Sequence, residues 1–351
     1  MSLINLPQPK WGSGTGRQVI LKSDFHTIEQ ALVESFALTR GPSLEYVDAA
    51  TLRVNATPDC KARIMLGGFP SPLHPGLWVD GSLSDGRYRE NATPATLNFN
   101  VSGSLWGTEK ANQWYAVYAL AGAADTTFSL KAMPFLRVSS QSTQVITLRN
   151  NANNSDIGYG FTTNELVEAK ILVLTGTSRG LARQITANNN DNTTQGTITY
   201  GGSSLTLAQG DWFIVLPKAN FRYLGAVFND ADSNLVPFYQ DGPAFTFRTP
   251  RNLSSGPLNG YTLFDLWAVA PPTARILKGL TAAQNGYDLK LAISYDGLNP
   301  ALILHGAPPS GDFQSTRGAI PFSSHLLADH TLYLNNENTD HQVVRITGWE
   351  E

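Results

Sequence analysis

The chain has one cysteine, Cys60, among its 351 residues, and few charged side chains. A single thiol excludes an intrachain disulfide bond and any zinc site built on several thiolates. Charged residues make up 15% of the sequence, whereas about 25% is usual for a soluble protein. The polar surface must therefore rely on the amides and hydroxyls of Asn, Ser and Thr, a composition that suits β-structure joined by tight turns.

Two further absences exclude classes of function. The net charge is −3, and the sequence has no cluster of Lys and Arg with interleaved aromatic residues that would predict a nucleic-acid surface. The most apolar run, residues 114–124 (WYAVYALAGAA), is far shorter than the roughly 20 residues that cross a bilayer, so it predicts buried strands. Residues 1–14 lack the charged start and apolar centre of a secretory signal. We therefore expect a chain made in the cytosol, with neither nucleic-acid binding nor membrane insertion.

One motif suggests catalysis, but its context argues against it. The segment GTSRG, residues 176–180, fits the G-x-S-x-G pattern of a hydrolase nucleophile elbow, which needs a strand before the serine and a helix after it. Residues 170–175 (KILVLT) predict the strand. The Asn-rich segment 188–192 follows so soon, with amides that favour turns, that no helix fits. We expect Ser178 to lie in a hairpin loop.

Other candidate catalytic or metal-binding residues are weaker still. In SSHLLADH, the spacing of His325 and His330 does not place both imidazoles on one helical face. Asp265 and His305 follow Ser178 in the order of a hydrolase triad, but a chain of this length offers such pairs by chance. Scattered carboxylates leave a glycosidase-type acid pair open, with no sign of one in the sequence. We predict no catalytic residue, no cofactor and no metal site.

The clearest helix is expected over Ser23 to Thr39 (SDFHTIEQALVESFALT), after an arm rich in Pro, Gly and Ser. Its apolar residues recur at helical spacing and form one stripe: Phe25, Ile28, Leu32 and Phe36. This stripe could dock onto its own domain or onto the same helix in neighbouring copies of the chain. We assign residues 1–42 to an arm and helix for attachment and oligomerisation.

From residue 43 onward the patterns are those of β-strands. Short segments that alternate apolar and polar residues predict a β domain over residues 43–144. Several short strands, the candidate 205–207 among them, predict a small closed barrel over 145–220, because closure removes exposed strand edges. The pattern over 221–351 predicts an antiparallel sandwich. The expected fold is thus mainly β, with several small antiparallel barrel or sandwich domains and one N-terminal amphipathic helix.

Three segments carry a resemblance to a known group of proteins. They are GYGFTTNELVEAKILVLTGTSRGLARQITANNNDNTTQGTITY…LTLAQGDWFIVLP (158–217), FRYLGAVFNDADSNLVPFYQDG (221–242) and LYLNNENTDHQVVRITGW (332–349). Within the first, Gly176, Gly180 and Arg183 match a Gly-x-x-x-Gly-x-x-Arg turn on a short barrel. In these features the chain resembles virion structural proteins of tailed bacteriophages, the group of tail-fibre, tail-tip and adhesin-like proteins.

The resemblance implies a non-enzymatic structural component of a virion, commonly a homotrimer, attached to other virion proteins through its N-terminal region. It places the chain in the tail-fibre or tail-tip apparatus, with a host-surface glycan as a further implied partner. Aromatic rings of the last domain are then candidate receptor contacts, with core packing as their alternative role: Tyr287, Tyr295, Tyr333 and Trp349. A capsid-decorating or head-fibre protein and a polysaccharide-degrading phage enzyme stay open as alternative functions.

Overall fold

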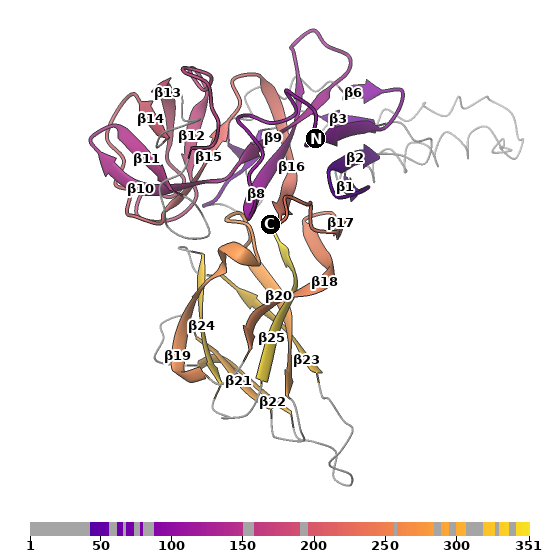
Figure 1. Cartoon of the computed structure of the whole chain (residues 1–351), viewed down its shortest axis with the longest axis vertical. Coiled ribbons are helices and arrows are strands. Elements are labelled where there is room, and N and C mark those ends of the chain that lie inside the picture. The colour runs from indigo at the N-terminus through magenta and orange to yellow at the C-terminus, as the bar shows by residue number, and fades with distance from the viewer. Residues whose placement is uncertain are drawn as a thin grey trace, which may run out of the picture. The chain divides into compact units, whose positions relative to one another are not determined.

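The computed structural model describes residues 43–55, 62–65, 68–73, 78–79, 88–149, 158–189, 196–255, 258–283, 289–294, 300–306, 319–326, 330–336 and 342–351. The arm and helix expected over residues 1–42 lie outside this set. Within it, every regular element is a strand except for one turn of 3-10 helix, η1 (Leu266–Ala268). Figure 1 shows these strands in several small sheets, so the expectation of a mainly β fold is confirmed.

Small antiparallel sheets open the described chain. A three-stranded sheet has the order β1 (Ser43–Tyr46), β2 (Thr51–Asn55), β7 (Ala95–Asn98). Two strand pairs accompany it, β3 (Ala62–Met65) with β6 (Tyr88–Asn91) and β4 (Phe69–Pro70) with β5 (Trp78–Val79). Leu52 and Val54 of β2 are buried, as is Leu44, which pairs with Val54. Burial of every second residue is the pattern of a strand with one face on the core.

The apolar run at residues 114–124 falls largely in β8 (Gln113–Ala121), the middle strand of a second three-stranded sheet. β9 (Ser129–Pro134) pairs with one edge of β8 and β16 (Asn220–Asn229) with the other. β8 is buried along almost its whole length, so the prediction of a buried strand is confirmed. The pairing of β16 skips a residue just before Gly225, whose φ is 144° and where a Cβ would overlap the Phe245 ring. This bulge therefore requires glycine.

Six strands between β9 and β16 close into a barrel. In order around the barrel they are β10 (Leu136–Ser142), β11 (Val145–Arg149), β14 (Thr197–Tyr200), β13 (Ala182–Asn188), β12 (Lys170–Val173) and β15 (Trp212–Leu216). All neighbouring pairs are antiparallel. The closed barrel expected in this part of the chain is thus present.

The strand composition of the barrel differs from the expectation in two places. The barrel begins at β10, before residue 145, because the chain passes from β9 to β10 through Phe135 alone, without a turn signal. Residues 205–207 are not a strand. The amide of Leu205 donates to the Tyr200 hydroxyl and that of Leu207 to Gln141 Oε1, at 3.0 and 2.9 Å, so side chains replace a neighbouring strand.

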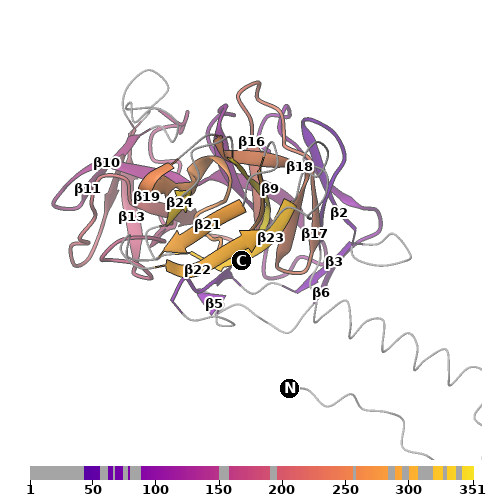
Figure 2. The same cartoon turned by 90° about the horizontal axis from the view of Figure 1, so that it is seen from below.

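The remaining strands form two antiparallel sheets, seen from below in Figure 2. The five-stranded sheet has the order β17 (Phe238–Asp241), β18 (Ala244–Ser255), β25 (Gln342–Glu350), β20 (Ile276–Ala283), β23 (Ala319–His325). The four-stranded sheet has the order β19 (Leu258–Asp265), β24 (Thr331–Asn336), β21 (Leu289–Ser294), β22 (Pro300–Gly306). Leu277, Val344 and Ile346 of the first sheet share a hydrophobic core with Ile293 and Leu334 of the second. This is the sandwich arrangement expected for the C-terminal strands.

Candidate functional site

Ser178 lies in the turn that joins β12 to β13, an antiparallel hairpin, as the sequence predicts. Its side chain is buried, with 4% of the residue exposed. Its Oγ accepts a hydrogen bond from the Thr206 amide at 2.7 Å, which ties the hairpin turn to the loop before β15. The hydroxyl oxygen is thus used to satisfy a backbone donor in a loop that has no strand partner.

Each fixed residue of the Gly-x-x-x-Gly-x-x-Arg motif has a structural role in or beside this turn. Gly176 and Gly180 have φ of 75° and 82°, a region that favours glycine. A Cβ on Gly176 would overlap the Asp211 carboxylate, and one on Gly180 would overlap Leu73. Arg183 donates from Nε to the Ser203 carbonyl at 2.8 Å, which binds β13 to the loop after β14. The motif therefore holds the end of the barrel together.

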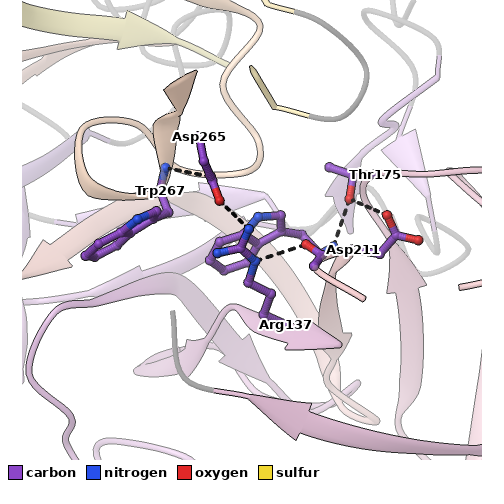
Figure 3. A network of polar contacts seen from close by, with 7 residues as sticks. Arg137, Thr175, Asp211, Asp265 and Trp267 are labelled. Carbon is purple, nitrogen blue, oxygen red and sulfur yellow. Dashed lines mark hydrogen bonds and ion pairs between the residues drawn. The ribbon is translucent and has the colours of Figure 1, made fainter. Parts of the chain in front are cut away.

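A polar network around Arg137 connects the barrel to the segment that follows β19 (Figure 3). Arg137 on β10 donates from Nε to the Gly210 carbonyl at 3.0 Å and from Nη2 to Asp265 Oδ2. Its guanidinium carbon lies 5.1 Å from the centre of the Trp212 ring. Asp265 also caps η1, since its Oδ1 accepts from the Trp267 amide at 3.3 Å. One arginine thus packs on a barrel tryptophan and pairs with a carboxylate outside the barrel.

Figure 3 also shows Thr175 and Asp211, which organise the barrel side of this region. The Trp212 amide donates to Thr175 Oγ1 at 2.8 Å, and Asp211 Oδ2 accepts from the Ala208 amide at 2.8 Å. The Thr175 hydroxyl lies 3.5 Å from Asp211 Oδ1. Both side chains are buried. They fix the loop before β15, so that Trp212 presents its ring to Arg137.

Trp349 is a core residue, which corrects its assignment as a candidate receptor contact. Its exposed fraction is 1%. The Phe245 ring stacks on it at 4.8 Å with an interplanar angle of 4°, and the Trp114 ring meets it edge-on at 5.1 Å. Trp114 in turn donates from Nε1 to the Trp267 carbonyl at 2.6 Å. With both sides of the indole covered by protein rings, no face is open to a sugar.

Of the other three candidate receptor contacts, only Tyr333 belongs to the described residues. Tyr333 on β24 is half-buried. Tyr287 and Tyr295 lie outside the described residues. His325 is exposed at the end of β23, whereas His330 is buried just before β24. Among the residues that the structure describes, no group of three or more His, Cys, Asp or Glu side chains is placed to hold a metal ion.

A carboxyl group with an unusual environment lies at Glu351. Its Oε1 accepts hydrogen bonds from the hydroxyls of Tyr223 and Thr273, at 2.7 and 2.8 Å. Although the residue as a whole is half-buried, the side chain rests on Tyr223, which is almost fully buried. Desolvation raises the pKa of Glu351 to about 7, and the hydrogen bonds offset only part of this effect.

The most exposed aromatic ring lies elsewhere, on β17. Tyr239 has 61% of its surface exposed, the largest value among the exposed large hydrophobic residues of the described chain. The guanidinium carbon of Arg248 lies 4.8 Å from the Tyr239 ring centre and 5.1 Å from that of Tyr46. We call these three residues the Tyr–Arg–Tyr stack. Sequence reasoning missed it because Tyr46 is 193 positions before Tyr239, although the alternation in FYQD does predict an outward-facing Tyr239.

Within the described part of the chain, no helix has the length and apolar character required to cross a membrane. Comparisons with family models, curated proteins and solved structures give no match for this chain.

Proposed function

We propose that this chain is a non-enzymatic structural subunit of a bacteriophage virion, most consistent with the tail-fibre or tail-tip apparatus. It assembles as a homotrimer and attaches to other virion proteins through its N-terminal region. The proposal rests on the resemblance carried by residues 158–217, 221–242 and 332–349.

One structural observation supports this proposal most directly. Three buried polar side chains at one end of the barrel, Ser178 of the GTSRG motif among them, accept hydrogen bonds from backbone amides. Ser178 accepts from the Thr206 amide, Thr175 from the Trp212 amide and Asp211 from the Ala208 amide. In these positions the side chains stabilise loops of the barrel, as expected for a rigid building block.

A low content of charge points in the same direction. Small β units bury little surface by themselves, and association with further copies adds burial that a single copy lacks. A surface rich in Asn, Ser and Thr can be buried between copies at a lower desolvation cost than a charged one. Self-association is therefore the physical property on which the proposal depends.

The test has two measurements on the full-length protein. Light scattering coupled to size-exclusion chromatography should give three times the mass of one chain at micromolar concentration. Mass spectrometry of particles purified on a density gradient should detect the chain in stoichiometric amounts. A stable monomer that is absent from purified particles would contradict the proposal. Particles that carry the chain on the head would keep the structural role but move its position to the capsid.

A further inference from the structure

We propose that the Tyr–Arg–Tyr stack of Tyr46, Arg248 and Tyr239 is a binding site for a saccharide that carries a carboxylate. The inference deepens the proposed function, since it names the ligand class that an exposed surface of the virion subunit would take. Its residues differ from the aromatic residues singled out in the sequence, and they come from β1, β17 and the middle of β18.

The stack is held rigidly from below. Along β17, Phe238 is buried and Tyr239 exposed, while Gln240 points back toward the protein. Gln240 accepts from the Leu44 amide at 2.6 Å and donates to the Leu224 carbonyl at 3.1 Å, which ties β17 to β1 and β16. The position of Tyr46 relative to Tyr239 is therefore fixed by hydrogen bonds beneath the two rings. A preformed site of this kind loses little conformational entropy when a ligand binds.

Arg248 is fixed as well, and its hydrogen-bonding capacity is open. Its amide donates to the Pro237 carbonyl at 3.0 Å, and its guanidinium lies between two tyrosine rings. No described residue forms an ion pair or a side-chain hydrogen bond with this guanidinium. A stacked guanidinium keeps the N–H groups at its edge available, and their fork matches the two oxygens of a carboxylate.

The exposed tyrosine selects a sugar among the ligands that carry a carboxylate. The face of an aromatic ring carries negative potential, and the C–H bonds on one face of a pyranose present weak positive charge to it. Tyr239 offers such a surface next to the Arg248 donors. A uronic or sialic acid residue combines both features, an apolar ring face and a carboxylate at its edge.

Among the described residues, the acidic side chains closest in sequence to the stack form no ion pair with Arg248. Glu45 is engaged in a two-point ion pair with Arg53, at 2.7 Å for each contact. Asp48 accepts hydrogen bonds within its own turn, which lower its pKa. Asp241 is exposed two residues after Tyr239 on β17.

Isothermal titration of the full-length protein tests the proposal with two probes, tetragalacturonate and a sialic acid dimer. The methyl ester of tetragalacturonate is the neutral comparison. We expect the acid form to bind at least about tenfold more tightly than the ester, since a hydrogen bond to a charged group contributes roughly that factor. Absence of binding by both acidic probes at millimolar concentration would overturn the proposal.

Variants locate the binding on the stack. Arg248→Gln should weaken binding of the acidic probe about tenfold and leave that of the ester almost unchanged. Tyr239→Ala should weaken both, whereas Tyr239→Phe should keep both within about threefold, because the ring is retained. Arg345→Gln is the matched control, since Arg345 is also exposed, on β25, and no aromatic ring among the described residues stacks on it. An equal loss in the Arg345 variant would overturn the assignment.

Particle incorporation separates this inference from the proposed function. Arg248→Gln should be incorporated into particles as well as the unmodified chain, because Arg248 itself is far in sequence from the attachment region proposed over residues 1–42. If wild-type protein binds no acidic saccharide and the Arg248 variant is lost from particles, the stack is a protein contact and the saccharide assignment is wrong. If saccharide binds but the chain is absent from particles, the proposed function fails and the binding site remains.

Discussion

The barrel and the C-terminal sheets deal with strand edges in opposite ways. β10 to β15 pair around a closed ring, so each barrel strand has a neighbour on both sides. The C-terminal sheets are open, and they end in β17 and β23 on one sheet and β19 and β22 on the other. An unpaired edge presents backbone donors and acceptors to any passing strand. The open sheets therefore need protection that the barrel does not.

The side chains on the edge strands of the open sheets also differ from those of the barrel. Two of the exposed large hydrophobic residues, Tyr239 and Leu263, lie on the edge strands β17 and β19. Pro321 lies on the edge strand β23, where it removes a donor that another strand could use. In the barrel, Gln141 and Tyr200 are directed into loop contacts. The open sheets thus carry exposed apolar side chains on their edge strands, whereas each strand of the closed barrel is paired on both sides.

The largest expected effect is a loss of stability caused by a substitution in the open five-stranded sheet. A Cβ at Gly348 on β25 would overlap the carbonyl oxygen of Phe245 in the adjacent strand. Gly348→Ala should lower the free energy of unfolding by about 3 kcal/mol, because backbone atoms cannot move without breaking the β18–β25 ladder. Gly201→Ala in the barrel is the control, since its Cβ would lie 3.3 Å from a movable Thr186 methyl group. Urea titration measures the free energy of unfolding of both variants. Equal losses in the two variants would contradict the argument that overlap with backbone atoms causes the effect.

The second prediction concerns the link between barrel and sheets. Arg137→Met should cost about 2 kcal/mol, since it leaves the Gly210 carbonyl and the Asp265 carboxylate without their donor. Asp265→Asn should cost less, because the Asp265 side chain is 37% exposed whereas that of Arg137 is 11% exposed. A double-mutant cycle, followed by differential scanning calorimetry, should give a coupling near 1 kcal/mol. Strict additivity of the two losses would contradict a direct link.

The third prediction concerns the pH dependence of stability that Glu351 causes. Glu351 has a folded-state pKa of about 7 against an ordinary value of 4.5. Between these values the folded chain holds a proton that the unfolded chain has released, so the free energy of unfolding falls as pH rises and levels off above about 7. The full pKa shift of Glu351 corresponds to a change of about 3 kcal/mol in the free energy of unfolding. We expect a change of about 2 kcal/mol, because solvent screens part of the effect at a half-buried residue.

Variants at the same site check this sign. Glu351→Gln cannot ionise, so the difference in stability between pH 5 and pH 8 should shrink by about 2 kcal/mol relative to the unmodified chain. Tyr223→Phe removes a hydrogen bond that lowers the pKa of Glu351, and it should move the transition to higher pH. Thermal melts from pH 5 to pH 8 measure both. An unchanged pH profile in the Gln variant would assign the dependence to other groups.

The sequence predicted the parts of the fold that local patterns control. The apolar run of β8, the hairpin around Ser178 and the glycines of that turn follow from strand periodicity and turn chemistry. Pairing between distant segments was not visible in the sequence. β16 pairs with β8 although all six barrel strands lie between them in the sequence. Nothing local in FRYLGAVF distinguishes β8 as its partner from a strand nearer in sequence. The start of the barrel at β10 was missed because no turn signal separates β9 from β10.

The candidate site was harder to predict than the fold. Trp349 and Tyr239 both occur in strands with alternating residues, and only the packing of a second sheet decides which ring is covered. Trp349 meets Phe245 and Trp114, whereas Tyr239 lies on β17, at the edge of its sheet, with 61% of its surface exposed. Arg248 gains its role from two tyrosines on different strands. Such a three-part contact depends on tertiary geometry that composition and spacing do not encode.

The position of the barrel within the chain limits how it could be exchanged. β9 ends at Pro134 beside Tyr115, near the start of β8, while β16 begins at Asn220 beside Ala121, at the end of β8. Those two points are six residues apart along one strand, which corresponds to about 20 Å. The barrel's own first and last strands are neighbours, since Leu136 on β10 pairs with Phe213 on β15, so the connecting residues 135 and 217–219 must cover much of this span. A module grafted in its place would need connecting residues that reach the same distance for the three-stranded sheet to form.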